Sequence, residues 1–117
     1  MPAEFEEAMM IHPGLRKCLN CMAVAYMDNT GGYISTTDYH TGTFIMPKRL
    51  FECPNKRMRV YVVFREMAGV CCYHLKGDLA GRPNPDEMRN VYLRRFPEWE
   101  ECELKCADWG WRFKYPM

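Results

Sequence analysis

Seven cysteines are the most chemically versatile residues of this chain, because thiols act as core side chains, metal ligands, disulfide partners or nucleophiles. Cys18 and Cys21 are separated by two residues, a spacing that lets two thiolates reach one zinc ion from a tight turn. Cys102 and Cys106 are four residues apart in a predicted helix, so they share one face. These four cysteines form a candidate zinc site. The simpler interpretation is that they are buried thiols, since free cysteine is among the most often buried residue types.

A redox function for the Cys18–Cys21 motif is a third interpretation. Arg16 and Lys17 place positive charge beside the motif, which would lower the pKa of a thiol. Redox motifs of this kind follow a strand and begin a helix, however, whereas here the predicted strand comes after the motif. The chain also contains no phosphate loop, dinucleotide fingerprint or nucleophile elbow. We therefore expect a protein that is not an enzyme, and we keep a thiol enzyme as an alternative.

Residues 57–65 (RMRVYVVFR) alternate in polarity and are rich in β-branched and aromatic side chains. This pattern predicts a half-buried strand. The outer face of that strand would carry the candidate partner-binding residues Arg57, Arg59, Tyr61 and Arg65. RNA-binding strands also combine arginines with aromatics, which makes nucleic acid an alternative partner. The match is weak, because Tyr61 and Phe64 would lie on opposite faces of the strand.

Aromatic side chains recur at every second position near the C-terminus. If this segment is a strand, one face carries Trp109, Trp111, Phe113 and Tyr115. Such a face is either the edge of the core or a docking surface, because interfaces are enriched in aromatic residues. We include these four residues among the candidate partner-binding residues.

The elements that must position these residues follow from hydrophobic patterns and turn signals. We expect a first hairpin from residues 22–27 and 33–37, a short strand at 43–46, and a second hairpin from 57–65 and 70–75. Helices are predicted at residues 3–11, from 85 to about 96 after the capping residue Asn84, and at 98–107. The sequence thus predicts one α+β domain over residues 1–117, with a small antiparallel sheet of two hairpins, a short N-terminal helix and two C-terminal helices.

Charge and hydropathy restrict the classes of function. The net charge of +1 is low for a protein that coats nucleic acid. The apolar stretches are far shorter than the roughly 20 residues needed to span a bilayer. The first ten residues are acidic, which is not typical of a signal or transit peptide. We therefore expect an intracellular protein in a reducing compartment, the cytoplasm or nucleus, with an organelle as the alternative.

Together these observations favour a non-enzymatic interaction protein, either an accessory protein or a small subunit of a larger assembly. It would bind a protein partner through its aromatic and methionine-rich surface and its arginine-rich strand, and homo-oligomers are compatible with this function. Viral accessory proteins are one class of small, cysteine-rich intracellular chains without catalytic signatures. The alternatives are a zinc-stabilised nucleic-acid-binding domain and a thiol enzyme.

Overall fold

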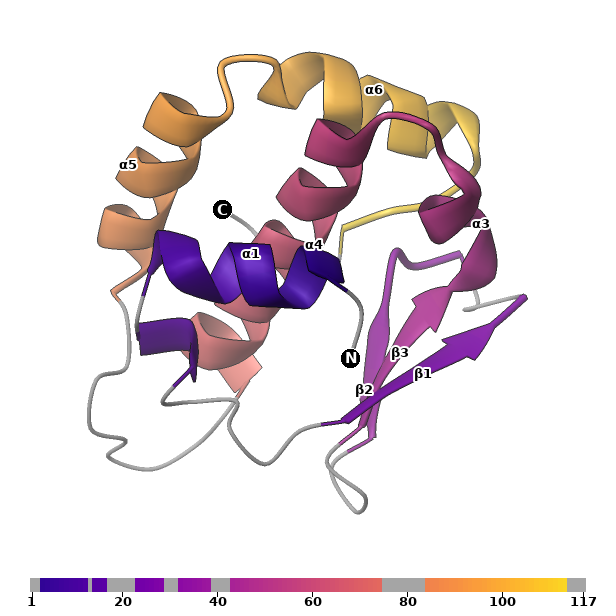
Figure 1. Cartoon of the computed structure of the whole chain (residues 1–117), viewed down its shortest axis with the longest axis horizontal. Helices are drawn as coiled ribbons and strands as arrows, with labels where there is room; N and C mark the ends of the chain where they lie inside the picture. The colour runs from indigo at the N-terminus through magenta and orange to yellow at the C-terminus, as the bar shows by residue number, and fades with distance from the viewer. Residues whose placement is uncertain are drawn as a thin grey trace.

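A computed structural model describes most of the chain, namely residues 3–12, 14–16, 23–28, 32–38, 43–74 and 84–113, without the side chains of 36–38 and 74. The protein is an α+β structure, as expected. Its elements are α1 (Ala3–Ile11), β1 (Ala23–Met27), β2 (Thr36–Asp38), β3 (Thr43–Pro47), α3 (Lys48–Glu52), α4 (Lys56–Gly69), the π-helical η1 (Val70–His74), α5 (Pro85–Arg95) and α6 (Trp99–Asp108). Figure 1 shows α4 in the centre, with α1, α5 and α6 around it and the sheet to one side.

Helix α4 occupies the segment for which alternation predicted a strand, so that prediction was wrong. The helix begins at Asn55, whose side chain accepts a hydrogen bond from the backbone N–H of Met58 at 3.2 Å. Asparagine is a favoured N-cap, because its oxygen satisfies a backbone donor that has no partner inside the helix. Pro54 precedes this cap, and proline is favoured just outside a helix rather than within it.

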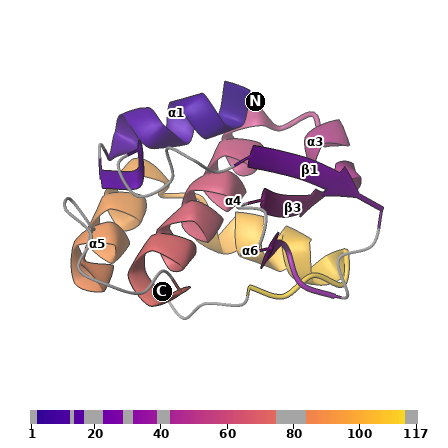
Figure 2. The same cartoon turned by 90° about the horizontal axis from the view of Figure 1, so that it is seen from below.

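Burial on nearly all sides explains why α4 lacks the hydrophobic periodicity of a surface helix. Every residue from Val60 to Gly69 is buried. The helix packs against α1, α5 and α6, and Figure 2 shows α1 and α6 on opposite sides of it. A helix that is enclosed in this way does not confine its apolar residues to one stripe, and here the buried set also includes Arg65 and Glu66.

The sheet has the order β1-β3-β2. Strand β3 lies in the middle, parallel to β1 and antiparallel to β2, with Ala25 beside Ile45 and Thr37 beside Phe44. The predicted first hairpin was therefore wrong, because residues 22–27 and the following segment do not pair with each other. Strand β2 instead pairs with the far edge of β3, so β3 lies between the two strands that precede it in the sequence.

The second predicted hairpin was also wrong. Residues 66–69 were expected to form a turn, but they belong to α4, and η1 continues the same helical rod. The backbone N–H of Val70 bonds to the carbonyl oxygens of both Glu66 and Met67, so the hydrogen bonds of α4 continue into the first residue of η1. The described residues of this predicted hairpin, 57–74, therefore supply no strand to the sheet.

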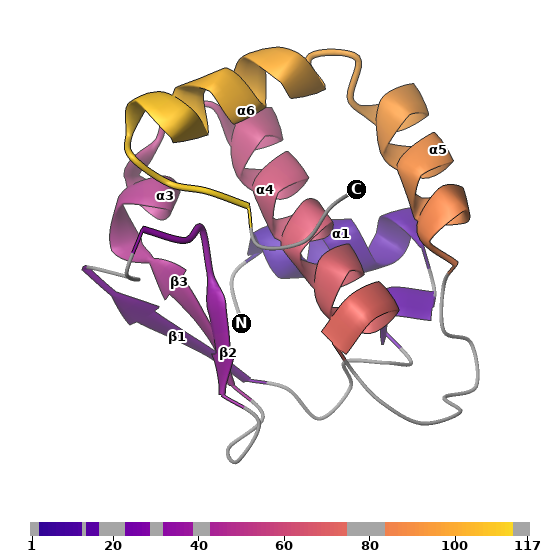
Figure 3. The same ribbon diagram turned by 180° about the vertical axis from the view of Figure 1, so that it is seen from behind.

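The C-terminal segment forms one isolated bridge rather than a regular strand in its described part. Arg112 pairs with Tyr33 in parallel: Ile34 N–H donates to the Arg112 carbonyl, and Arg112 N–H donates to the Gly32 carbonyl, both at 2.9 Å. Seen from behind in Figure 3, the described part of this segment runs from the end of α6 toward α4.

Helices α1, α5 and α6 lie where the sequence predicts them, whereas α3 was not predicted. Helix α1 has the predicted bounds, and α5 begins at Pro85 after Asn84, whose side chain accepts from the N–H groups of Asp86 and Glu87. Helix α6 is displaced by one residue from its prediction. No helix in the described part of the chain has both the length and the apolarity that crossing a bilayer requires.

Candidate functional site

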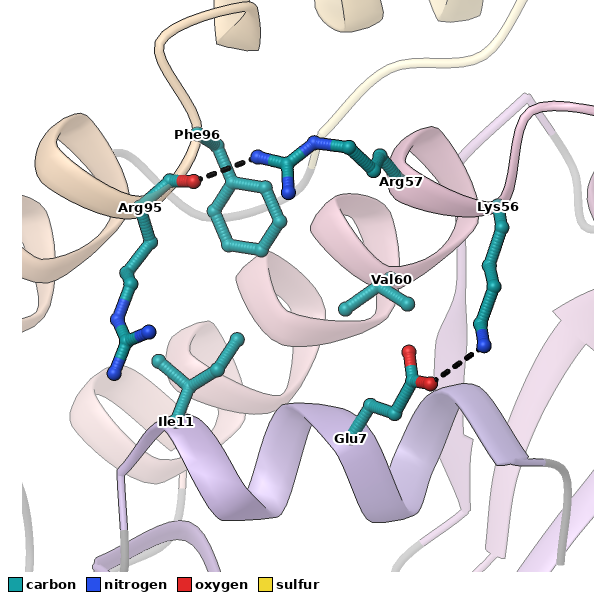
Figure 4. A pocket seen from close by; sticks show the side chains of 7 residues that line it. All are labelled: Glu7, Ile11, Lys56, Arg57, Val60, Arg95 and Phe96. Carbon is teal, nitrogen blue, oxygen red and sulfur yellow. Dashed lines mark hydrogen bonds and ion pairs between the residues drawn. The ribbon is translucent and has the colours of Figure 1, made fainter.

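A groove of about 360 Å³ opens between α1, the first turns of α4 and the end of α5. The side chains that line it come from all three helices and from the residue after α5 (Figure 4): Glu7, Ile11, Lys56, Arg57, Val60, Arg95 and Phe96. Helical spacing explains the set. Glu7 and Ile11 are four residues apart on α1, and Lys56 and Val60 are four apart on α4, so each pair points to the same side.

The floor of the groove is apolar. Val60 and Phe96 are buried, with 7% and 3% of their surface exposed, and Ile11 is half-buried against the same core. Phe96 is held in place by Tyr61 and Phe64, whose rings lie 5.3 and 5.9 Å from its own, centroid to centroid. The floor is therefore part of the packed hydrophobic core, and only its outermost edge is accessible from the groove.

Two of the three cations on the rim are already engaged. Lys56 Nζ lies 2.7 Å from Glu7 Oε1. Arg57 donates from Nε to Glu98 Oε1 at 2.5 Å and from Nη2 to the Arg95 carbonyl at 2.8 Å. The charged hydrogen bond with Arg57 lowers the pKa of the Glu98 carboxyl, and the same bond raises the pKa of Arg57.

Arg95 is the exception on the rim. Its side chain is exposed and forms no ion pair with a carboxylate of the described residues. In Figure 4 its guanidinium lies above Ile11, beside the apolar floor. An unpaired cation next to an open apolar surface can receive an acidic group and an apolar group from the same ligand.

A hydrogen bond between His12 and Glu87 ties the two walls of the groove together. His12 Nε2 lies 2.6 Å from Glu87 Oε1, and His12 Nδ1 accepts from the backbone N–H of Gly14 at 3.0 Å. Because Nδ1 accepts, the proton of the neutral ring is on Nε2 and is donated to Glu87. The bond lowers the pKa of the Glu87 carboxyl and joins the end of α1 to the first turn of α5.

The predicted partner-binding residues of the 57–65 segment lie in different environments. Arg57 is on the rim of the groove. Arg59 is half-buried, with Nε 3.2 Å from Glu4 Oε1 and a second hydrogen bond to the Cys53 carbonyl. Tyr61 is fully buried, and its hydroxyl donates to Glu103 Oε1 at 3.1 Å. Burial by its neighbours raises the pKa of this phenol, so it stays protonated.

Arg65 is also buried, with Nε 2.9 Å from Glu103 Oε1 and its guanidinium 3.9 Å from the centre of the Phe113 ring. The strand interpretation placed Tyr61 and Arg65 on an outer surface, whereas the helix places both inside the protein.

The described aromatics of the C-terminal segment pack against the core. Trp109, Trp111 and Phe113 are partly buried. The Trp109 and Trp111 rings meet edge to face at 5.2 Å, and Arg49 lies 5.4 Å from the Trp109 ring centre. Tyr115 lies outside the described residues. That these aromatics bind a partner stays a prediction.

Only half of the predicted zinc site falls on described residues. Cys102 and Cys106 are buried, and burial is the main reason why their pKa values rise to about 11 and about 12. Cys18 and Cys21 lie outside the described residues. The described residues alone contain no group of three histidine, cysteine or acidic side chains arranged to hold a metal ion. Zinc binding therefore stays a prediction, as does a redox role for Cys18 and Cys21.

Sequence reasoning missed most of the groove, because its residues become neighbours only when α4 is a helix. Ile11 and Phe96 were recognisable only as helix residues, and Arg95 only as a basic residue near a helix end. No protein-family model matches the chain, and no curated protein is significantly similar to it.

Proposed function

We propose that this protein is a non-enzymatic interaction protein that binds an acidic segment of a protein partner in the groove between α1, α4 and α5. The observation that carries the proposal is Arg95, an exposed cation that pairs with no carboxylate of the described residues and lies beside the apolar floor of Ile11, Val60 and Phe96. A carboxylate of the partner would meet Arg95, and an aliphatic side chain next to it would enter the groove.

The size of the groove supports a peptide as the ligand. A volume of about 360 Å³ is at the lower end of the range that accommodates small ligands, and one or two side chains fill such a space. Arginine forms two parallel hydrogen bonds with a carboxylate, which would orient the segment. The preformed floor lowers the entropy lost on binding, because Phe96 is already fixed by its aromatic neighbours.

The charges on the rim favour a ligand with a single acidic group over a nucleic acid with a continuous phosphate backbone. Glu7 lines the groove, and Glu98 lies at its edge on Arg57. These carboxylates would repel a polyanion that ran along the groove, and the chain as a whole carries a net charge of only +1. Binding of nucleic acid is therefore the outcome that would contradict this proposal.

Replacing Arg95 with alanine tests the proposal directly. The probe is a short fluorescent peptide in which leucine is flanked by glutamates, and its binding is followed by anisotropy. We expect Arg95→Ala to weaken binding about tenfold, because an interfacial charge pair is lost. The matched control is Arg94→Ala, which removes the same charge from the neighbouring exposed position outside the groove and should leave the affinity within about twofold.

Three results would contradict the proposal: equal losses in the two variants, no binding of the peptide by the unmodified protein, or tighter binding of a labelled single-stranded oligonucleotide. Circular dichroism of both variants confirms that the fold is retained.

A reducing compartment remains part of the proposal. The described cysteines 53, 102 and 106 are free thiols, and all three are buried. Such thiols are typical of intracellular proteins. The arrangement supports a role in packing for them.

A further inference from the structure

The outer face of α6 carries the acidic and apolar groups that the groove would bind. Its exposed residues include Glu100, Glu101, Leu104 and Asp108, while Cys102 and Cys106 face the core. Leu104 is 67% exposed, which is high for a leucine on a packed helix. This face therefore combines carboxylates with a largely exposed aliphatic side chain.

The carboxylates of this face are unpaired in the described structure. Glu98 and Glu103 point to arginines of α4, Arg57 and Arg65. In contrast, no ion pair joins Glu100, Glu101 or Asp108 to a cation of the described residues. An acidic helix face without partners and a groove with an unpaired arginine thus occur in the same molecule, and their charges are complementary.

We propose that a second copy of the chain occupies the groove, through Glu101 and Leu104 of its α6, so that the protein forms a homodimer. This inference rests on the proposed function, because it uses the same groove and names the acidic segment that binds there. Leu104 would enter over the floor of Ile11, Val60 and Phe96, and Glu101 would meet Arg95.

The groove and the outer face of α6 are neighbours, which favours a closed two-fold dimer over an open-ended polymer of copies. Arg57 on the groove rim is bonded to Glu98, the residue that precedes α6, so the basic and acidic surfaces are neighbours. In a two-fold dimer, the groove of each copy faces the outer surface of α6 of the other copy. The same contact then forms twice, and both unpaired surfaces are covered at once.

Charge exchange between two variants tests the dimer. We expect the unmodified protein to sediment as a dimer that dissociates on dilution at some point between about 1 mM and about 1 μM. Arg95→Glu and Glu101→Arg, each alone, should raise the dissociation constant about tenfold or more. An equimolar mixture of the two variants should return to within about threefold of the unmodified protein, because each groove then faces an α6 of opposite charge.

Matched controls separate contact from net charge. Arg94→Glu and Glu52→Arg make the same changes in charge at exposed positions outside the groove and outside α6. Both should leave the dissociation constant within about twofold, and their mixture should show no gain. Full effects in these controls, or no rescue in the mixture of Arg95→Glu with Glu101→Arg, would overturn the proposal.

The failure of this inference is distinguishable from failure of the proposed function. If the protein stays monomeric up to about 1 mM but binds the acidic peptide through Arg95, the groove is a binding site and the second copy is not its occupant. Species that grow beyond a dimer would exclude the two-fold arrangement. If the dimer forms, the acidic peptide should compete with it and shift sedimentation toward the monomer.

Discussion

Two arginines on the rim of the groove have different roles: Arg57 stabilises the structure, and Arg95 is the proposed binding residue. Arg57 is fixed by a carboxylate and a backbone carbonyl, and its guanidinium also lies 5.5 Å from the centre of the Phe96 ring. Arg95 contributes only its carbonyl to this arrangement, so its charged group remains available. A ligand would have to displace Glu98 to reach Arg57, whereas no carboxylate of the described residues occupies Arg95. This difference is why the binding prediction concerns Arg95.

The buried thiols of α6 predict how stability changes with pH. Burial raises the pKa of Cys102 to about 11 and that of Cys106 to about 12, from an ordinary value of about 9. Above pH 9 the unfolded chain therefore loses protons that the folded chain retains, and the free energy of unfolding decreases as the pH rises toward 11. Tyr61 adds to the decrease, because its pKa is raised too.

Replacing Cys106 with alanine should reduce this dependence. The expected difference in slope is about 1 kcal/mol per pH unit between pH 9 and 11, measured by urea denaturation in the presence of reductant. Equal slopes in the two proteins would show that Cys106 ionises as readily in the folded state as in the unfolded one.

Helices α1, α5 and α6 pack against α4, and the N-terminus of α4 is capped by a single side chain. Asn55 accepts from the Met58 N–H, a donor that would otherwise have no partner within the helix. We expect Asn55→Ala to lower the free energy of unfolding by about 1 kcal/mol and Asn55→Asp to lower it much less, because aspartate keeps the acceptor. Chemical denaturation measures both, and equal losses would mean that the cap contributes nothing.

How far the sequence predicts each element depends on whether its signals are local. The start of helix α5 is predicted by Asn84 and Pro85, because a cap residue and a proline at the first helical position act within a single turn. Helix α4 also has a local cap, Asn55, but only the structure identified it, and the alternation in residues 57–65 predicted a strand instead. That alternation has two separate causes. The arginines at 57 and 59 lie in the first turn, which reaches solvent, and the apolar residues that follow are covered from several sides.

The candidate site depends on packing between elements, which local signals do not describe. Arg57 was recognised as a candidate from its position in a basic segment. Ile11, Val60 and Phe96 come from three separate parts of the chain, and nothing in their spacing relates them. Their proximity follows from the packing of α1 and α5 on α4, and this packing could not be derived while residues 57–65 were assigned to a sheet.

A buried network connects the central helix to the C-terminal part of the molecule. Glu103 of α6 accepts from Tyr61 and pairs with Arg65, and the Arg65 guanidinium stacks on Phe113. The exposed fractions of the Arg65 and Glu103 side chains are only 10% and 25%. Removing one member of such a pair leaves the other charge without compensation in a poorly solvated site.

We expect Glu103→Ala to lower the free energy of unfolding by about 3 kcal/mol. The double variant Arg65→Met, Glu103→Leu should be less destabilised than Glu103→Ala alone, because no unpaired charge is buried. A double-mutant cycle by denaturation measures both. If the double variant is as unstable as the sum of its single variants, the two residues do not act as a pair.

Because α4 is covered in part by segments that follow it in the sequence, its packing can be completed only late in translation. The helix is made when α5, α6 and the segment that carries Phe113 have not yet been translated. While the chain grows, the apolar surface of residues 60–69 therefore has only α1 and the sheet to cover it. Arg65 meets Glu103 and Phe113 only after both have emerged from the ribosome, so folding is finished after translation has passed residue 113.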